Sequence, residues 1–325
     1  MHAAGFVKLL SQFQGLSVDQ ICQAKEALKE QENQREGLFV LRERETSVTC
    51  CPHCSAASFV RYGRRGGRQR FRCKEVKCGK TFNVLTGTPR ARLRQPEKHI
   101  ENAKCMAARS TLREASSKLK VAMSTAFRWR HRFLKSMATM PPNELVGIVE
   151  VDETFFLESF KGQRSGLTRK AKKRGTSAAQ RGLSREQIPV LVARDRSEHG
   201  NTLTQRLEAR DAKHISSVLI PRLVKGKDVV LVSDSASVFK MIGRAHRIEV
   251  RQVPRHPKHR TTGLTHINNV NNYTQRLKSW MIGFVGVATK YLANYLGWHR
   301  WLDANRKTKT GRHFLEASIG WALLA

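Results

Sequence analysis

The sequence predicts a multi-domain α/β protein, with small N-terminal modules followed by a larger domain built on a mixed sheet flanked by helices. Three observations predict this architecture. Two closely spaced pairs of cysteines occur within residues 46–90, and residues 91–140 carry apolar side chains at helical spacing. From about residue 145, short apolar runs typical of strands alternate with helical segments, which is the pattern of a sheet covered by helices.

Composition narrows the class of partner. The chain has 325 residues, enough for more than one domain, and its 60 Lys and Arg against 26 Asp and Glu give a formal net charge of +34. A charge this large attracts polyanions, of which nucleic acid is the commonest, although ribosome-associated and membrane-surface proteins share the property. The sequence shows no apolar run long enough for a spanning helix and no secretory pattern, so we expect a cytoplasmic protein.

Residues 1–45 are predicted to be helical. The stretch Ser17–Gln20 resembles a capping box, and Val18, Ile21 and Leu28 follow at helical spacing. No residues here have the types and spacing that catalysis or metal binding needs. We interpret the segment as a helical appendage or an oligomer contact.

Cysteine spacing predicts a metal site in residues 46–90. Seven cysteines are present, and four of them form the pairs Cys51-x2-Cys54 and Cys73-x4-Cys78. The odd number and the close pairing favour thiolate metal ligands in a reducing compartment over disulfides. Four thiolates suit tetrahedral Zn²⁺, so we predict one structural zinc ion.

The residues between the cysteine pairs predict a hairpin, and with it a zinc ribbon. Strands are expected at 58–62 and 68–72, and a hairpin this small cannot hold a core alone. Either neighbour, Cys50 or His53, could replace one of the four ligands. Arginines along the hairpin, with Arg64 and Arg65 as candidates, predict a phosphate-binding surface, although a solvated basic face has the same composition.

Residues 91–140 are predicted to form a helix-turn-helix-like region. A capping box at Thr111–Glu114 begins one short helix, and a second helix follows a break at Lys120-Val121. The second helix of such a motif enters the major groove of DNA. Lys120 stands where these turns often carry Gly, and a generic basic three-helix bundle explains the pattern equally well. The candidate DNA-contacting residues are Ser124, Thr125, Arg128 and Arg132, whereas Trp129 is expected in the core.

Residues 145–325 carry the larger α/β domain. Strands are expected at 146–152, 188–194, 201–207, 229–233 and 247–253, and helices at 212–224, 235–245 and from residue 266 onward. This order resembles that of the RNase H-like nucleases and integrases. Residues 157–187 are rich in Lys, Arg, Gly and Ser, so we expect an exposed basic insertion whose candidate DNA contacts are Lys172, Lys173 and Arg174.

Two aspartates follow apolar strands in this domain. Asp152 and Asp234 stand where their strands are expected to end, so strand pairing could place the two carboxylates side by side. Such a pair can hold two Mg²⁺ ions for phosphoryl transfer. A lone Asp after a strand is usually a turn or cap residue, but two of them together with the basic charge favour catalysis. Glu153 should face the other side of the sheet, and Glu150, which shares the face of Asp152, is a rival ligand.

A polar helix from His266 to Lys278 could supply the remaining groups. The side-chain carbonyl of Asn271 can ligate Mg²⁺ without adding charge. Lys278 lies two turns further along the same helical face, where its ammonium could hold a phosphate of the scissile strand.

The chain resembles bacterial insertion-sequence transposases of the DDE superfamily, in the group with an N-terminal zinc ribbon. The resemblance covers nearly the whole length. It rests on the cysteine pairs and on the motifs Leu85–Thr88, Val149–Thr154, Lys172–Gly175, Val190–Asp195, Ser233-Asp234, His266–Lys278 and Val287–Trp298.

The resemblance implies a catalytic triad of two Asp residues and a third Glu or Asn, followed by a Lys. Asp152, Asp234, Asn271 and Lys278 match these positions, and His266 and Asn268 belong to the same motif in supporting roles. The Asn leaves the site one negative charge short of the Glu variant.

The implied cofactors are two Mg²⁺ or Mn²⁺ ions per active site. The implied reaction is cleavage at the element ends and transfer of the 3′-OH ends to target DNA. Terminal inverted repeats and target DNA are the implied partners, with at least a dimer in the DNA complex. The alternative is a catalytically silent DNA-binding protein derived from a transposase. A third hypothesis, an RNase H-type hydrolase of hybrids, conflicts with the N-terminal modules.

Overall fold

The structure is a computed structural model that describes residues 3–163, 165–167, 178, 184–198, 200–224, 229–234, 237–253, 265–307 and 309–320. Two compact units make up the chain, one formed by Met1–Phe133 with Thr310–Ala325 and the other by Leu134–Lys309. The candidate DNA contacts Lys172, Lys173 and Arg174 lie outside the described residues. Within the described part of the chain, no helix is both long enough and apolar enough to cross a bilayer.

The first unit begins with two helices, as predicted. Helix α1 (Ala3–Gln12) leads through a short 3₁₀ turn (Phe13–Gly15) into α2 (Val18–Thr46). The predicted capping box starts α2, because the Ser17 hydroxyl accepts from the Gln20 N–H and the Gln20 side chain accepts from the Ser17 N–H.

The ribbon is a three-stranded antiparallel sheet in the order β1-β2-β3. Its strands are β1 (Phe59–Arg65), β2 (Arg68–Cys73) and β3 (Thr81–Phe82). The rings of Phe59, Phe71 and Phe82 pack with centroids 5.4–5.6 Å apart and form a small core with Cys51 and Cys73. The first two strands were predicted from the sequence. The short third one was not, because two residues carry too little pattern.

The rest of the first unit is helical. A 3₁₀ turn (Pro96–Lys98) precedes α3 (His99–Ala107), α4 (Leu112–Leu119) and α5 (Met123–Thr139), whose residues from Leu134 onward belong to the second unit. After the second unit comes α10 (Gly311–Ser318). The capping box at Thr111 and Glu114 is present. Lys120 ends α4 in the left-handed conformation, at φ 49° and ψ 51°, so a lysine occupies the place that glycine often takes in such turns. Trp129 is buried, as expected of a core residue.

The second unit is built on a five-stranded mixed sheet in the order β6-β5-β4-β7-β8. Strands β4, β5 and β6 are antiparallel neighbours, and β4, β7 and β8 run parallel. The strands are β4 (Ile148–Leu157), β5 (Gln187–Asp195), β6 (Thr202–Arg206), β7 (Val230–Ser233) and β8 (Glu249–Gln252).

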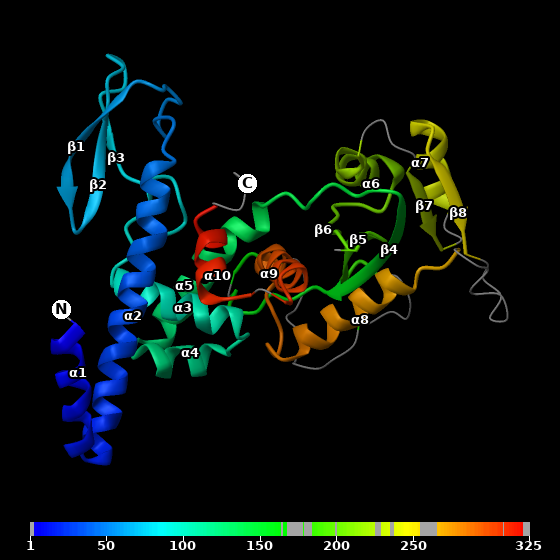
Figure 1. Cartoon of the computed structure of the whole chain (residues 1–325). Coiled ribbons are helices and arrows are strands. Elements are labelled where there is room, and N and C mark those ends of the chain that lie inside the picture. Colours follow the sequence, from blue (N-terminus) through cyan, green and yellow to red (C-terminus); the bar gives the residue numbers. More distant parts are fainter. Residues whose placement is uncertain are drawn as a thin grey trace. The chain divides into compact units, whose positions relative to one another are not determined.

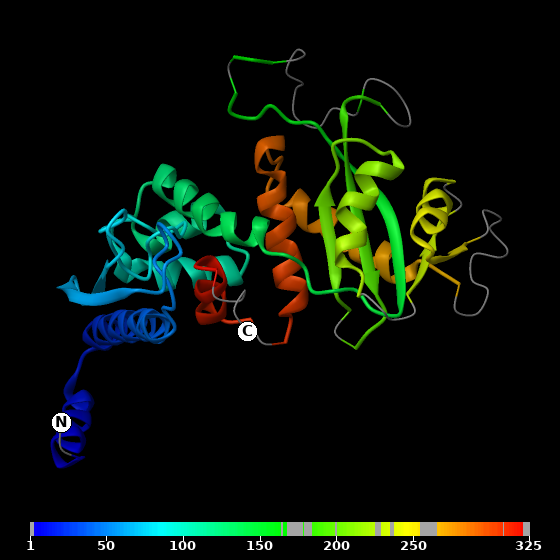
Figure 2. The same cartoon turned by 90° about the horizontal axis from the view of Figure 1, so that it is seen from above.

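Helices cover both faces of this sheet (Figures 1 and 2). Side chains of α6 and α7 pack against Val149, Val151 and Leu231 on one face, and α8 and α9 pack against Val190 and Val192 on the other. The predicted mixed sheet flanked by helices is therefore present. These helices are α6 (Ala212–Leu219), α7 (Ser237–His246), α8 (Asn268–Ile282) and α9 (Leu292–Ala304).

Two element boundaries differ most from the expectation. Strand β4 does not end at Asp152 but continues to Leu157, because the strand-forming residues Thr154–Phe156 pair with β5 after the pairing with β7 has stopped. Helix α6 ends at Leu219, since Pro221 cannot continue the α-helical hydrogen bonds and the chain passes into a 3₁₀ turn (Ile220–Arg222).

Candidate active site and metal centre

Asp152 lies on the face of β4 that α8 covers. It stands opposite Val192 of β5, which belongs to the core shared with α8 and α9. Side chains alternate along a strand, so Glu150 and Thr154 share this face, whereas Val151 and Glu153 face α6 and α7. The side chain of Asp152 therefore points toward the helix that carries Asn271 and Lys278.

Asp234 follows directly after the last residue of β7. The parallel pairing of β4 with β7 ends with Val151 opposite Ser233, so Asp152 and Asp234 are the next residues on two adjacent strands. Neighbouring strands lie about 4.8 Å apart, which brings the two carboxylates to one edge of the parallel pair. The two aspartates are thus neighbours because β4 pairs with β7 up to the residues that precede them, although β4 itself continues past Asp152.

Electrostatics link three of the predicted residues. Burial raises the pKa of Asp152 from 3.8 to about 6, and the carboxylates of Asp234 and Glu153 act in the same direction. A hydrogen bond from the Glu153 backbone and the ammonium of Lys278 oppose that rise in the pKa of Asp152. Asp152 and Asp234 repel each other, and a divalent cation bound between them would lower this repulsion.

Helix α8 presents Asn271 and Lys278 on one exposed flank. Val270, Tyr273 and Leu277 of the same helix face the sheet and are buried. The two polar residues are seven positions apart, or about two turns, so they lie on one side of the helix. The sequence prediction of one shared face therefore matches the geometry of the helix.

The position of α8 depends on Glu150, which is fully buried. Its Oε2 accepts from the backbone N–H groups of Asn269 (2.7 Å) and Val270 (3.0 Å), in the first turn of the helix. Its Oε1 accepts from the Asn269 side chain and from Arg196 Nε, both at 2.8 Å. Glu150 was a rival metal ligand in the sequence prediction. Its oxygens are instead occupied in capping α8, two residues from Asp152 on the same strand face.

Arg196 and His266 complete this anchor. Arg196 Nη2 donates to the His266 carbonyl (2.8 Å) and to its Nδ1 (3.1 Å), and the Asn268 N–H also points to that nitrogen (3.4 Å). His266 therefore supports the start of α8, and Asn268 is the first residue of the helix.

A second anchor holds the middle of α8. Asp303 of α9 accepts from Arg276 of α8 and from Arg194 of β5, the latter at 2.8 Å. The Thr204 hydroxyl of β6 also donates to the Tyr273 hydroxyl of α8 (3.0 Å). Sequence reasoning missed Arg194, Arg196, Arg276 and Asp303, because an ion pair between distant segments leaves no periodic pattern.

Glu153 lies on the opposite face, as expected. Its Oε2 accepts from Arg210 Nη2 (2.6 Å) and Nε (3.0 Å), and the guanidinium of Arg210 also lies 5.1 Å from the ring of Phe155. Glu153 is thus paired with Arg210, on the face of the sheet opposite to the helix that carries Asn271 and Lys278.

Two buried hydroxyls on these two elements, Thr154 Oγ1 of β4 and Thr274 Oγ1 of α8, have no hydrogen-bond partner among the described residues. Thr154 is on the Asp152 face of β4, and Thr274 follows Asn271 by three positions on α8. A buried polar group without a hydrogen bond costs about 1–3 kcal/mol, so each hydroxyl is expected to bind water or another polar group. Two carboxylates and an amide carbonyl are ligands that fit a hydrated divalent cation of the Mg²⁺ type.

Divalent-metal binding is expected to depend on the protonation of Asp152. Because its pKa is raised to about 6, this carboxyl is protonated, and unable to ligate, below that pH. We expect Mn²⁺ affinity to be constant above about pH 7 and to fall about tenfold per pH unit below pH 6. Titration calorimetry of zinc-loaded protein between pH 5 and 8 measures this. Affinity that stays flat through pH 6 would contradict the assignment.

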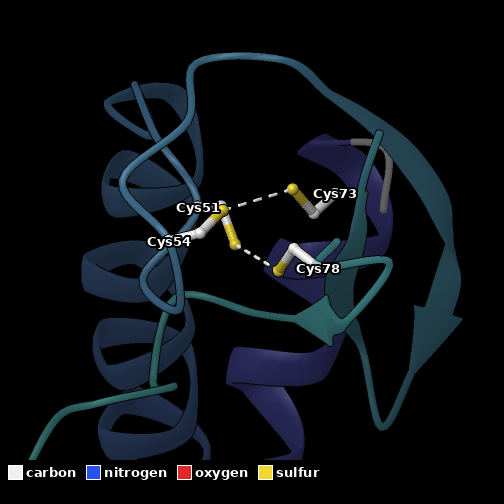
Figure 3. Close-up of side chains that lie close together, drawn as sticks. All are labelled: Cys51, Cys54, Cys73 and Cys78. Carbon is white, nitrogen blue, oxygen red and sulfur yellow. Dashed lines mark hydrogen bonds between the residues drawn. The ribbon is translucent and has the colours of Figure 1, made fainter. Parts of the chain in front are cut away.

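The four predicted cysteines converge at one end of the ribbon. Their sulfur atoms all lie within 4.8 Å of one another, with Cys51–Cys78 at 3.9 Å and Cys54–Cys73 at 3.6 Å (Figure 3). Tetrahedral zinc with bonds of about 2.3 Å separates its sulfur ligands by about 3.8 Å, so the cluster fits zinc. Neither neighbour belongs to the cluster, and Cys50 is exposed.

Replacing Cys73 with Ser is expected to remove the bound zinc. Burial raises the pKa of Cys73 to about 12 in the metal-free site, so zinc must displace a proton from this thiol to bind it, and Ser offers no thiolate in its place. Metal analysis should give about one zinc per wild-type chain and almost none in the variant. Cys50→Ser is the matched control and should keep its zinc. A Cys73→Ser protein with full zinc content would remove Cys73 from the ligand set.

The candidate DNA-contacting arginines differ in what they touch. Arg64 is exposed and lies 4.0 Å from Glu45, and Arg65 is exposed at the end of β1. Ser124 and Arg128 are exposed on α5, and Thr125 is half-buried and accepts from Arg128. Arg132 donates to the carbonyls of Pro89 (2.6 Å) and Ala91 (2.8 Å).

Comparison with known proteins identifies the class. A family model described as an ISXO2-like transposase domain matches residues 144–301. An uncharacterised protein in transposable element ISH50 of Halobacterium salinarum is 24% identical over 249 residues, which cover 76% of this chain and 82% of that protein.

Two solved structures are also similar, the Mos1 strand transfer complex and a pre-cleavage Mos1 transpososome. They share 13% and 14% identity with this chain and cover 64% of it in each case. The matches span 76% and 77% of those chains, with TM-scores of 0.24 and 0.23.

The mixed sheet flanked by helices lies within the residues that match the transposase domain. Residues 144–301 match an ISXO2-like transposase domain, and together with the similarity to a protein of a transposable element this supports an insertion-sequence transposase of the DDE superfamily.

Proposed function

We propose that this transposase cuts DNA at the ends of its element and joins the freed 3′-OH ends to target DNA. The observation that carries the proposal is the position of Asp152 and Asp234 at the end of one parallel strand pair, with Lys278 within electrostatic reach. The strand order, three antiparallel strands and then two parallel ones, supports an RNase H-like assignment.

The side chains divide the chemistry between them. Asp152, Asp234 and the Asn271 carbonyl would hold the divalent ions, Mg²⁺ or Mn²⁺, two per site. When bound, these ions polarise the scissile phosphodiester and activate the attacking water. Lys278 would bind a phosphate oxygen of the scissile strand, and the Glu150 anchor would keep Lys278 and Asn271 in register with Asp152.

Both steps are in-line displacements at phosphorus. In the first, the oxygen of water bonds to phosphorus, the bond to the 3′ oxygen breaks, and that oxygen leaves as the 3′-OH. In the second, this 3′ oxygen attacks a target phosphorus and displaces the 3′ oxygen of the target strand. Little covalent work falls to the protein, so positioning and charge neutralisation dominate.

DNA recognition is assigned to the basic modules. The net charge of +34 supports binding to the DNA backbone. The ribbon, with Arg64 and Arg65, and helix α5, with Ser124, Thr125 and Arg128, would read the terminal repeats. Arg132, which is bound to backbone carbonyls, would support the loop at residues 89–91. The insertion with Lys172, Lys173 and Arg174 would contact DNA as well, and the protein would act in the cytoplasm on the nucleoid.

A catalytically silent DNA-binding protein is the second candidate, and Asn271 is the observation that favours it. The test uses zinc-loaded protein, labelled element-end DNA and a plasmid target, with Mg²⁺ or Mn²⁺. The proposal expects nicks with 3′-OH ends and joined products. Specific binding without either product under both metals would favour the silent protein, and cleavage of RNA–DNA hybrids lacking end sequences would favour a hydrolase.

A further inference from the structure

Helix α1 and the first half of α2 bury little of their apolar surface within the described chain. No side chain from Val7 to Glu32 is buried, and large apolar residues are open to solvent, among them Val7, Leu10 and Val18 at 64%, 48% and 77% exposure. Isolated helices shorter than about 12–15 residues are marginal in water, and α1 has 10. This segment therefore needs a partner to be stable.

Charge excludes DNA as that partner. The stretch from Val7 to Glu32 contains three lysines and four acidic residues, so its net charge is −1, whereas the whole chain carries +34. A neutral, apolar surface gains nothing from a phosphate backbone. This difference in charge favours a second copy of the chain as the partner. Two copies repel each other through their basic surfaces, and the repulsion is weakest at a neutral patch such as this one.

A candidate receptor for α1 lies further along α2. A hollow of about 670 Å³ is lined by apolar Leu28 and Phe39 and by charged residues, including Glu32, Arg35 and Arg312. Leu28 is 61% exposed, and the guanidinium of Arg312 covers the ring of Phe39 at 4.6 Å. Leu28 and Phe39 could pack against Leu9 and Leu10 of α1. Lys8, which precedes these two leucines, could pair with Glu32.

We propose that two copies of the chain associate through these helices, with α1 of each copy lying in the Leu28–Phe39 hollow of the other. The exchange is reciprocal, so it closes as a two-fold dimer and leaves no open end. The basic surfaces stay free, and the dimer forms without DNA or divalent metal. This interface would join two copies before either one binds an element end.

The test is the mass of the full-length, zinc-loaded protein by light scattering, over a dilution series in high salt without DNA. Wild type should be a dimer of twice the chain mass. Leu9→Asp with Leu10→Asp should raise the dissociation constant about 100-fold or more, since two leucines lose their burial. Met241→Asp, at an exposed apolar residue of α7, is the control and should remain dimeric.

Complementation tests the receptor itself. Leu28→Asp alone should also be monomeric, but mixing it with the Leu9→Asp/Leu10→Asp chain should restore dimers, because one intact α1 then meets one intact hollow. A mixture that stays monomeric, a monomeric wild type, or a dimer unaffected by the α1 changes would overturn the proposal. So would a different protein occupying this surface on a monomeric chain. Loss of cleavage in a protein that still dimerises would count against the proposed reaction only.

Discussion

Asp152→Asn is expected to reduce strand cleavage by about a thousandfold or more, while element-end binding is retained. The substitution removes a charged metal ligand, and a bound cation contributes several kcal/mol of charge stabilisation in the transition state. The DNA-contacting candidates of the ribbon and α5 are in the other compact unit, so binding should not change. Single-turnover cleavage and an end-binding titration measure the two effects separately.

The same variant should be more stable than wild type in metal-free buffer. The pKa of Asp152 is raised in the folded state, so the ionised carboxylate weakens the fold above about pH 6 and has no effect once it is protonated. The gain is about 3 kcal/mol at most near pH 7 and should vanish near pH 4.

Asp211→Asn is the matched control for both measurements. Asp211 is an N-cap of α6, a role that Asn also fills, so neither cleavage nor stability should change much. Full cleavage by the Asp152 variant would remove this residue from the active site. A variant that is less stable at pH 7 would show that the carboxylate is a structural group.

Glu150→Gln is expected to destabilise the second unit by about 3–5 kcal/mol, the usual cost of breaking a buried charged pair. The N–H groups of Asn269 and Val270 donate to a Glu150 oxygen, and the NH₂ group of Gln could not accept from them. Arg196 would also lose its counter-charge. Chemical unfolding monitored by tryptophan fluorescence reports on this unit through Trp280, Trp298 and Trp301. Where the variant is still folded, cleavage should be slower with little change in DNA affinity, because α8 is displaced.

Glu153→Gln is the control, one strand position past Asp152 on the opposite face. The Glu153 side chain is 7% exposed but its partner Arg210 is 39% exposed, so the loss should be smaller than for Glu150→Gln, about 1–2 kcal/mol. A double-mutant cycle with Arg196→Met should give a coupling of more than about 1 kcal/mol for Glu150. If Glu150→Gln unfolds at the same denaturant concentration as Glu153→Gln, the anchoring role is wrong.

Elements with local patterns were predictable. Two strands of the ribbon and all five strands of the large sheet lie where apolar alternation or apolar runs predict them, and both capping boxes form. The cysteine cluster was equally accessible, because a short hairpin brings both pairs together whatever the rest of the chain does. The end of β4 was misplaced because Asp152-Glu153 resembles a strand end, whereas pairing with β5 carries the strand on to Leu157.

Contacts between distant segments were not predictable. The role of Glu150 depends on Asn269, 119 positions away, and on Arg196, 46 positions away, so the sequence could not separate a metal ligand from a helix anchor. For the same reason the attachment of α10 to α3, where Gly311 lies against Lys104, has no local pattern.

The residue types and their spacing were thus sufficient to predict the strands, the capped helices, the thiolate cluster and the two aspartates, because neighbours along the chain impose those patterns. Which carboxylates face the polar helix, and which are occupied in holding it, depended on the register of β4 with β5 and β7 and on buried charge pairs. Such pairs form only after folding has brought the segments together, and their partners are therefore invisible in any local stretch of residues.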